Sequence, residues 1–198
     1  MKLQALALSL LAATGLATPV RRDVGQAVYT LRLSSRVATL DGVYLTTSAN
    51  GSTLGVYPTP AAERLHVYPV KNPTTGLAEL RTQGAGNTLA VVGKHGLLDF
   101  ASLEDPAAVP VPEGGKCDWT SFRLDDEEQG GVLRYAGEGA QNGGGWAAFP
   151  DVTAEGGWSV KWKGGCLLTE LRGGNIAKAF TTEEYMPVQV VYERVKDE

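Results

Sequence analysis

The chain has 198 residues, with 18 lysines and arginines against 22 aspartates and glutamates, and a formal net charge of −4. An acidic chain attracts neither nucleic acid nor an anionic membrane surface, so neither is expected as a partner. After the first apolar segment, no apolar run reaches the length needed to cross a bilayer.

Residues 1–17 have the pattern of a secretory signal peptide. Lys2 supplies the positive start, and Leu3–Ala13 form an apolar run that is too short to span a membrane. Small residues precede an expected cleavage after Ala17. The sequence therefore predicts secretion to the extracellular space or cell wall.

Residues 18–22 end in the dibasic pair Arg21-Arg22, which resembles a late-secretory processing site of the kind fungi use. We expect cleavage after Arg22; the alternative is a mature N-terminus that carries two chance arginines. Cleavage removes three bases and no acid, so the net charge changes from −4 to −7. Residues 23–198 then form a single domain, which is long enough to bury a sizeable core.

The remaining chain reads as short strands separated by turns. Asp41-Gly42 and Asn50-Gly51 are strong two-residue hairpin signals, and no stretch keeps a helical period. About twelve short antiparallel strands predict an all-β domain, and we prefer a β-trefoil-like arrangement narrowly over a β-sandwich. The predicted strands cover residues 28–33, 36–40, 43–47, 53–57, 65–70, 77–82, 88–92, 97–101, 118–124, 132–135, 158–163, 167–171, 176–180 and 188–195. Residues 102–116, rich in proline and glycine, are expected to form a long loop.

The heaviest aromatic segment lies in the predicted strand 158–163. Trp158, Val160 and Trp162 alternate with polar residues, so a strand places them together on one face. Aromatic pairs bury large areas, so we assign this face to the core. The alternative, an exposed tryptophan pair, would form a platform for sugars.

Two sites of covalent modification are predicted. Cys117 and Cys166 are the two cysteines of a chain expected to be secreted, and we expect them to form a disulfide bond. The loop this bond closes would stabilise the fold by roughly 4 kcal/mol. Asn50-Gly51-Ser52 is a sequon for N-glycosylation on a turn, where a glycan is tolerated.

No constellation for catalysis, metal binding or a cofactor emerges. His66 and His95 have no neighbour at metal-ligand spacing. The acidic run that begins at Asp125 imitates the start of a calcium loop, but Ala136 stands where such a loop needs its glutamate. We therefore predict a non-enzymatic protein with no metal and no cofactor.

Three segments carry a family resemblance: residues 29–35, residues 122–135, and Trp158-Ser159-Val160-Lys161-Trp162 followed by Gly165-Cys166. Together they resemble the fungal phialide-type secreted cell-wall proteins. The resemblance implies a cell-wall protein linked to conidiation or stress protection, with no catalytic residues.

The sequence thus favours a non-enzymatic fungal extracellular or cell-wall protein. The alternatives are a carbohydrate-binding, lectin-like module and a secreted effector that acts on a host or competitor. The partner is then a cell-wall polysaccharide or an extracellular protein. Trp119 and Trp146 are the candidate ligand-facing residues, and Tyr57 and Tyr135 are further aromatics expected to be exposed.

Overall fold

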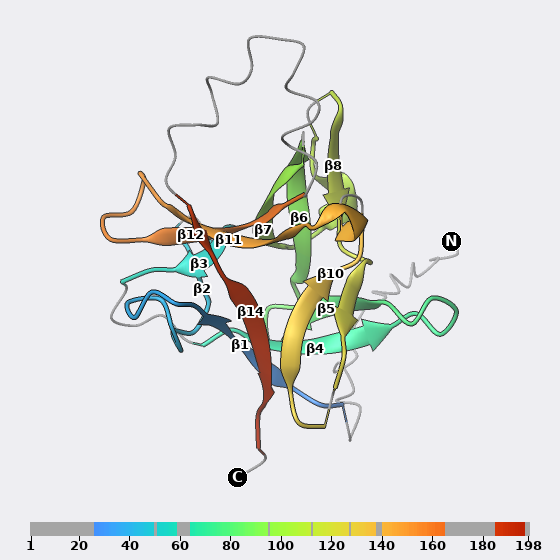
Figure 1. The fold of residues 1–198 in the computed structure, drawn as a ribbon. Helices are drawn as coiled ribbons and strands as arrows, with labels where there is room; N and C mark the ends of the chain where they lie inside the picture. The colour runs from blue at the N-terminus through green and yellow to red at the C-terminus, as the bar shows by residue number, and fades with distance from the viewer. Residues whose placement is uncertain are drawn as a thin grey trace, which may run out of the picture.

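The computed structural model describes residues 26–49, 51–58, 64–94, 96–111, 113–126, 128–137, 140–164 and 185–196. This part of the chain is all-β, as predicted, with fourteen strands and two 3-10 turns (Figure 1). The elements are β1 (Tyr29–Ser34), β2 (Thr46–Thr47), β3 (Leu54–Val56), β4 (His66–Lys71), β5 (Ala78–Thr82), β6 (Thr88–Lys94), β7 (Leu97–Leu103), η1 (Pro106–Ala108), β8 (Gly115–Asp118), β9 (Phe122–Leu124), β10 (Gly131–Tyr135), η2 (Ala140–Asn142), β11 (Gly145–Pro150), β12 (Trp158–Lys163), β13 (Met186–Pro187) and β14 (Gln189–Arg194). In the same described residues, no helix is long and apolar enough to cross a membrane.

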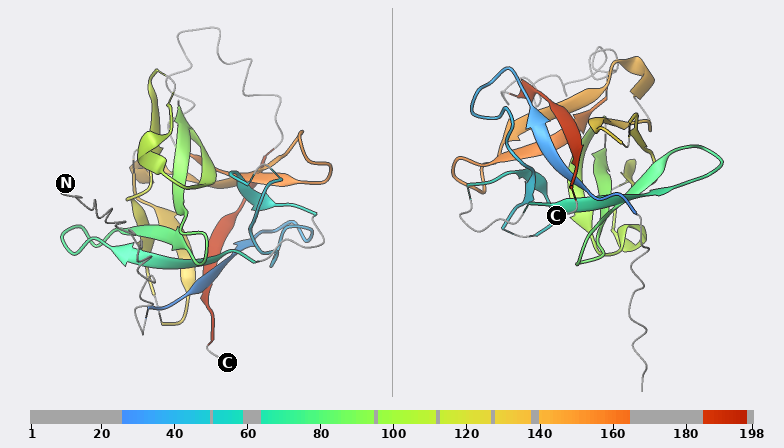
Figure 2. Two further views of the ribbon diagram at one scale, coloured as in Figure 1. Left: turned by 180° about the vertical axis from the view of Figure 1, so that it is seen from behind. Right: turned by 90° about the horizontal axis from the view of Figure 1, so that it is seen from below.

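Six strands close into an antiparallel barrel in the order β1, β4, β5, β9, β10 and β14. The closing pair joins the first and last of these strands: Tyr29 lies opposite Arg194, and Ser34 lies opposite Gln189. Figure 2 shows β1 and β14 side by side in the view from below. Closure gives each barrel strand a neighbour on both sides, so the barrel itself has no free edge.

Three hairpins are inserted between barrel strands: β2–β3, β6–β7 and β11–β12. They also pair with one another, because β12 bonds to β11 on one side and to both β7 and β3 on the other. Figure 1 shows β3, β7, β11 and β12 together above β1 and β4. The hairpins therefore form a second layer over the barrel, with the main core between the two layers.

Five aromatic side chains link the two layers in a closed circuit of ring contacts. Phe100 contacts Phe122 and Trp146, with ring centroids 5.9 and 4.8 Å apart. Trp146 contacts Trp162 at 5.2 Å, and Trp162 contacts Tyr135 at 5.3 Å. Tyr135 returns to Phe122 at 6.1 Å. Each such pair stabilises by about 0.5–1.5 kcal/mol beyond its buried area, so this aromatic circuit is a major cohesive element.

The assignment of the β12 face to the core is confirmed. Trp162 is 5 % exposed and Val160 is fully buried, while Trp158 packs against the core at its edge. Ser159, expected to face outward, is also buried, and its hydroxyl donates to the Phe149 carbonyl at 3.5 Å.

The predicted strand over residues 36–40 is wrong. Residues 36–42 form a turn, in which Asp41 accepts a hydrogen bond from the Ser35 backbone N–H and Leu40 is buried. Leu33 pairs directly with Val43 beyond the turn, so the hairpin exists with a longer loop. Gly42 adopts the left-handed conformation that its turn requires, at φ 73°.

The expected long loop over residues 102–116 is shorter than predicted. β7 continues to Leu103, and β8 begins at Gly115 and pairs with β6. Between them, Asp105 caps the short η1 turn by accepting from the Ala107 N–H. The strands predicted at 167–171 and 176–180 lie outside the described residues.

Close strand packing makes Gly55 essential. A Cβ at Gly55 would overlap the carbonyl oxygen of Trp158 on the neighbouring strand. Backbone atoms cannot swing aside, so Gly55→Ala is expected to destabilise the fold by about 3 kcal/mol. The matched control is Gly145→Ala, since a Cβ at that strand glycine meets open space. Denaturant unfolding checks both variants, and equal stability of the two would contradict the packing.

Asp151 organises the turn between β11 and β12. It accepts hydrogen bonds from the Thr153 N–H at 2.9 Å, the Thr153 hydroxyl at 2.6 Å and the Tyr57 hydroxyl at 2.9 Å. The bond from the Thr153 hydroxyl is the main cause that lowers the pKa of Asp151. Burial of Tyr57, and next its hydrogen bond to Asp151, raise the pKa of Tyr57 strongly.

Asp151→Ala is expected to cost about 1–2 kcal/mol of unfolding free energy at neutral pH. A lowered pKa in the folded state means that the carboxylate stabilises the fold above the unfolded pKa of about 3.9. This contribution is lost as the pH falls below that value toward the lower folded pKa. Unfolding curves at pH 7 and pH 3 should therefore show a smaller difference between wild type and variant at pH 3. Glu155→Ala, on the exposed side of the same turn, is the control and should show no such convergence.

Candidate functional site

An open pocket of about 620 Å³ lies beside β10, η2 and the start of β11. Its wall is the stretch from Val132 to Ala136, and it also reaches Leu77, Trp162 and Val188. The volume falls within the usual range for small-molecule sites, about 300–1,000 Å³. Several elements distant in sequence meet here because β10 pairs with both β9 and β14.

The floor of the pocket is aromatic. Tyr135, Trp146 and Trp162 all line it, and they belong to the aromatic circuit that joins barrel and hairpins. Tyr135 is 1 % exposed, and each tryptophan is 5 % exposed. The rings meet edge to face, so their broad faces are largely covered by one another. The floor is therefore rigid and apolar, rather than an open stacking platform.

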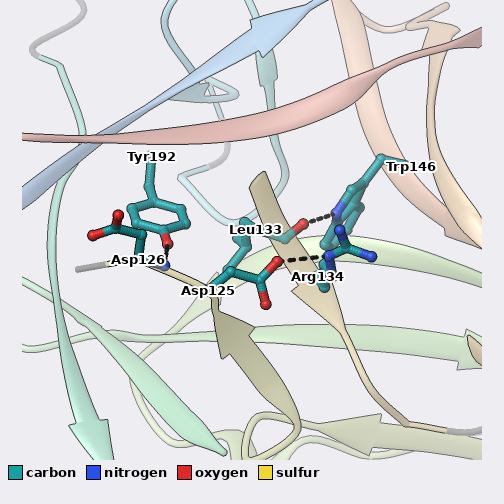
Figure 3. Close-up of polar contacts among 6 residues, drawn as sticks. All are labelled: Asp125, Asp126, Leu133, Arg134, Trp146 and Tyr192. Carbon is teal, nitrogen blue, oxygen red and sulfur yellow. Dashed lines mark hydrogen bonds and ion pairs between the residues drawn. The ribbon is translucent and has the colours of Figure 1, made fainter. Parts of the chain in front are cut away.

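The two tryptophans differ in how their indole N–H groups are satisfied. Trp146 Nε1 donates to the Leu133 carbonyl at 2.7 Å, a buried bond between β11 and β10 (Figure 3). Trp162 Nε1 is equally buried, and no acceptor for it is found among the residues that the structure describes. A buried donor without a partner is rare, and it often marks a place where water or a ligand supplies the acceptor.

Tyr135 is held in a fixed position at the junction of floor and wall. Its hydroxyl donates to Asp118 Oδ2 at 2.8 Å, and the Lys116 ammonium lies 5.5 Å from its ring centre. Gly137 leaves room for that hydroxyl, because a Cβ there would overlap it. The pocket is thus shaped in advance of any ligand, which lowers the entropic cost of binding.

The rim is polar and positively charged. Arg123 and Arg134 line it together with Thr75, Gln141 and Gln189. Arg134 Nε donates to Asp125 Oδ2 at 2.9 Å, and Figure 3 shows this pair beside the Trp146–Leu133 bond. Among the described lining residues there is no aspartate or glutamate. The rim thus offers donors for oxygen-rich ligands.

The turn between β9 and β10 is anchored to the barrel. The Asp126 N–H donates to the Tyr192 hydroxyl at 2.7 Å, as Figure 3 shows. Burial is the main cause that raises the pKa of Tyr192, so it stays a neutral phenol at physiological pH. The Asp126 carboxylate accepts from the Glu128 and Gln129 N–H groups and closes the turn. This acidic turn therefore stabilises the β9–β10 hairpin, which bears the two arginines of the rim.

The predicted ligand-facing residues are placed differently from one another. Trp146 lines the pocket, but as part of its buried floor. Trp119 is half-buried on the loop after β8 and does not line this pocket. The expected exposure of Tyr57 and Tyr135 is wrong, because both are buried and bonded to carboxylates. The fold thus brings Trp146 and Tyr135 together at the pocket, and Trp119 and Tyr57 lie outside it.

Several predicted sites lie outside the described residues. These are Ala17, Arg22, Asn50 and Cys166. Cys117 lies on β8, half-buried and with a free thiol in the structure, and burial raises the pKa of that thiol. The Cys117–Cys166 disulfide stays a prediction. Within the described ranges, no group of three or more His, Cys, Asp or Glu side chains is arranged to hold a metal ion.

Sequence reasoning missed Arg123, Arg134 and Gln141 as site residues. The two arginines occupy outward positions in short strands, where charged residues are ordinary. Their opposition depends on the pairing register of β9 and β10, which no local sequence pattern gave. Comparisons with protein-family models, curated proteins and solved structures found no match to this chain.

The contrast between the tryptophans gives a matched test. Trp146→Phe removes the bond to the Leu133 carbonyl and leaves that buried acceptor unpaired. This loss is expected to lower the free energy of unfolding by about 1–3 kcal/mol, in addition to the effect of the smaller ring. Trp162→Phe makes the same change in ring size but removes a donor that has no acceptor in the described part of the chain. Chemical unfolding should therefore show the larger loss for Trp146→Phe; an equal or reversed order would contradict the described bonding.

Proposed function

We propose that this chain is a secreted, non-enzymatic extracellular or cell-wall protein that binds a carbohydrate in the pocket beside β10. The observation that carries this proposal is the pocket itself, with its rigid aromatic floor and its rim of arginine and amide donors. Sugars present apolar C–H faces and many hydroxyl oxygens, so they suit an apolar floor with polar donors around it.

Secretion rests on the signal-like residues 1–17 and the dibasic pair that follows. A fungal cell-wall context rests on the resemblance of residues 29–35, 122–135 and 158–166 to phialide-type proteins. Catalysis is not part of the proposal, because the pocket rim supplies hydrogen-bond donors but no described carboxylate or histidine that would serve as acid or base.

We further infer that the fold is a β-trefoil. The six-strand barrel and the insertion of one hairpin between each of three pairs of barrel strands support this inference. The chain then consists of three units, β1–β4, β5–β9 and β10–β14, with β8 and β13 as additions. The pocket belongs mainly to the third unit. The fold class alone does not define a function, so the proposal depends on the pocket.

A second candidate is an effector directed at a host or competitor protein. One observation favours it: Val152 is 98 % exposed at the tip of the hydrogen-bonded turn between β11 and β12. An aliphatic side chain presented on a rigid turn is suited to insertion into a pocket of another protein.

Gly145 allows a direct test of the pocket. It lines the pocket, and a Cβ there meets no atom within 4 Å. Gly145→Phe is expected to fill the pocket and abolish binding to the cognate polysaccharide, while Gly145→Ala retains binding. The measurement is a titrated pull-down of the secreted protein on chitin, β-glucan and whole fungal wall, with circular dichroism to verify folding. Binding that survives Gly145→Phe in a folded protein would exclude this pocket. If the wild-type protein binds neither these polymers nor any acidic polysaccharide, the carbohydrate function is excluded.

A further inference from the structure

Two arginines face each other directly across the hairpin that walls the pocket. Arg123 on β9 and Arg134 on β10 are register partners, so their side chains project from the same face of the sheet. Both side chains are exposed, and both line the pocket. Opposed residues of an antiparallel pair have Cβ atoms about 4.5–5.5 Å apart, so both guanidinium groups reach a common point.

This juxtaposition is unfavourable for folding. Like charges that lie directly opposite in a sheet repel each other. Asp125 pairs with Arg134 and offsets one of the two charges. Arg123 makes no ion pair within the described part of the chain, so its charge remains uncompensated there.

The local charge also opposes that of the whole chain. Acidic residues outnumber basic ones, 22 to 18, yet arginine supplies every charged side chain among the described lining residues. A cationic spot on an acidic protein attracts anions locally while the rest of the surface repels them. The Asp125 bond uses Nε of Arg134, which leaves its terminal N–H groups for another acceptor.

We propose that the pocket selects an acidic saccharide, whose carboxylate is bound between Arg123 and Arg134. This inference rests on the carbohydrate function proposed above and adds the chemical class of the ligand. Two planar guanidinium groups match a carboxylate with charge-assisted hydrogen bonds. The anion also removes the repulsion between the arginines, so the unfavourable pair becomes favourable once the ligand is bound. The apolar floor of Tyr135 and the tryptophans lies under the sugar ring.

The binding test uses polygalacturonate as the acidic probe and its methyl ester as a probe with the same backbone and no charge. Wild-type protein is expected to bind the acid form and to bind the ester at least about 10-fold more weakly. Arg123→Gln should weaken binding to the acid form by about 10-fold to 100-fold. Arg194→Gln is the matched control, because it removes an equal charge from an exposed arginine on β14 outside the pocket. Its binding should change less than about twofold.

Thermal unfolding without any saccharide gives a second readout. It distinguishes a binding role of Arg123 from a purely structural one. Arg123→Gln relieves the repulsion and should raise Tm by about 1 °C, while it weakens binding. A lower Tm together with unchanged binding would overturn the proposal. If the protein binds the acid and ester forms equally, or binds only neutral wall polymers, the ligand is not an acidic saccharide, while the carbohydrate function stands. Failure of all saccharides to bind would overturn both.

Discussion

The structure depends on the circuit of aromatic contacts through Phe100, Phe122, Tyr135, Trp146 and Trp162. Backbone hydrogen bonds hold strands within each layer, but they do little to fix the hairpin layer above the barrel. These rings do so, because two of them come from barrel strands β9 and β10 and three from hairpin strands β7, β11 and β12. Three of these rings, those of Tyr135, Trp146 and Trp162, also form the floor of the pocket. Stability of the two-layer fold and the shape of the site therefore have one physical origin.

Features that depend on local pattern could be predicted from the sequence. The alternation in residues 158–163 identified the buried face of β12, and glycine-bearing turns marked the hairpins. Local pattern failed at residues 36–40, where a side-chain-capped turn replaced the expected strand. It also failed to predict burial of Tyr57 and Tyr135, because each hydroxyl is satisfied by a carboxylate distant in sequence. From sequence alone, a tyrosine is predicted to be exposed when the hydrogen-bond partner of its hydroxyl is unknown.

The site could not be predicted because it depends on register between strands. Arg123 and Arg134 become opposed only when β9 and β10 pair with the specific alignment that also places Tyr135 opposite Phe122. A shift of one residue in this pairing would place the two arginines on opposite faces of the sheet. Likewise, the open volume near Gly145 arises where the chain passes from barrel strand β10 into hairpin strand β11, and distant segments complete its lining. Trp146, which was predicted to face a ligand, lies in the buried floor of the pocket.

Closure of the barrel also has a consequence for the order of folding. Arg32 on β1 pairs with Glu193 on β14, and these residues are 161 positions apart in the chain. At a synthesis rate of about 5–20 residues per second, the first barrel strand waits on the order of 10 s for its final neighbour. During that interval its apolar face and one edge lack their native cover. The nascent chain must therefore stay unfolded or be protected until β14 emerges.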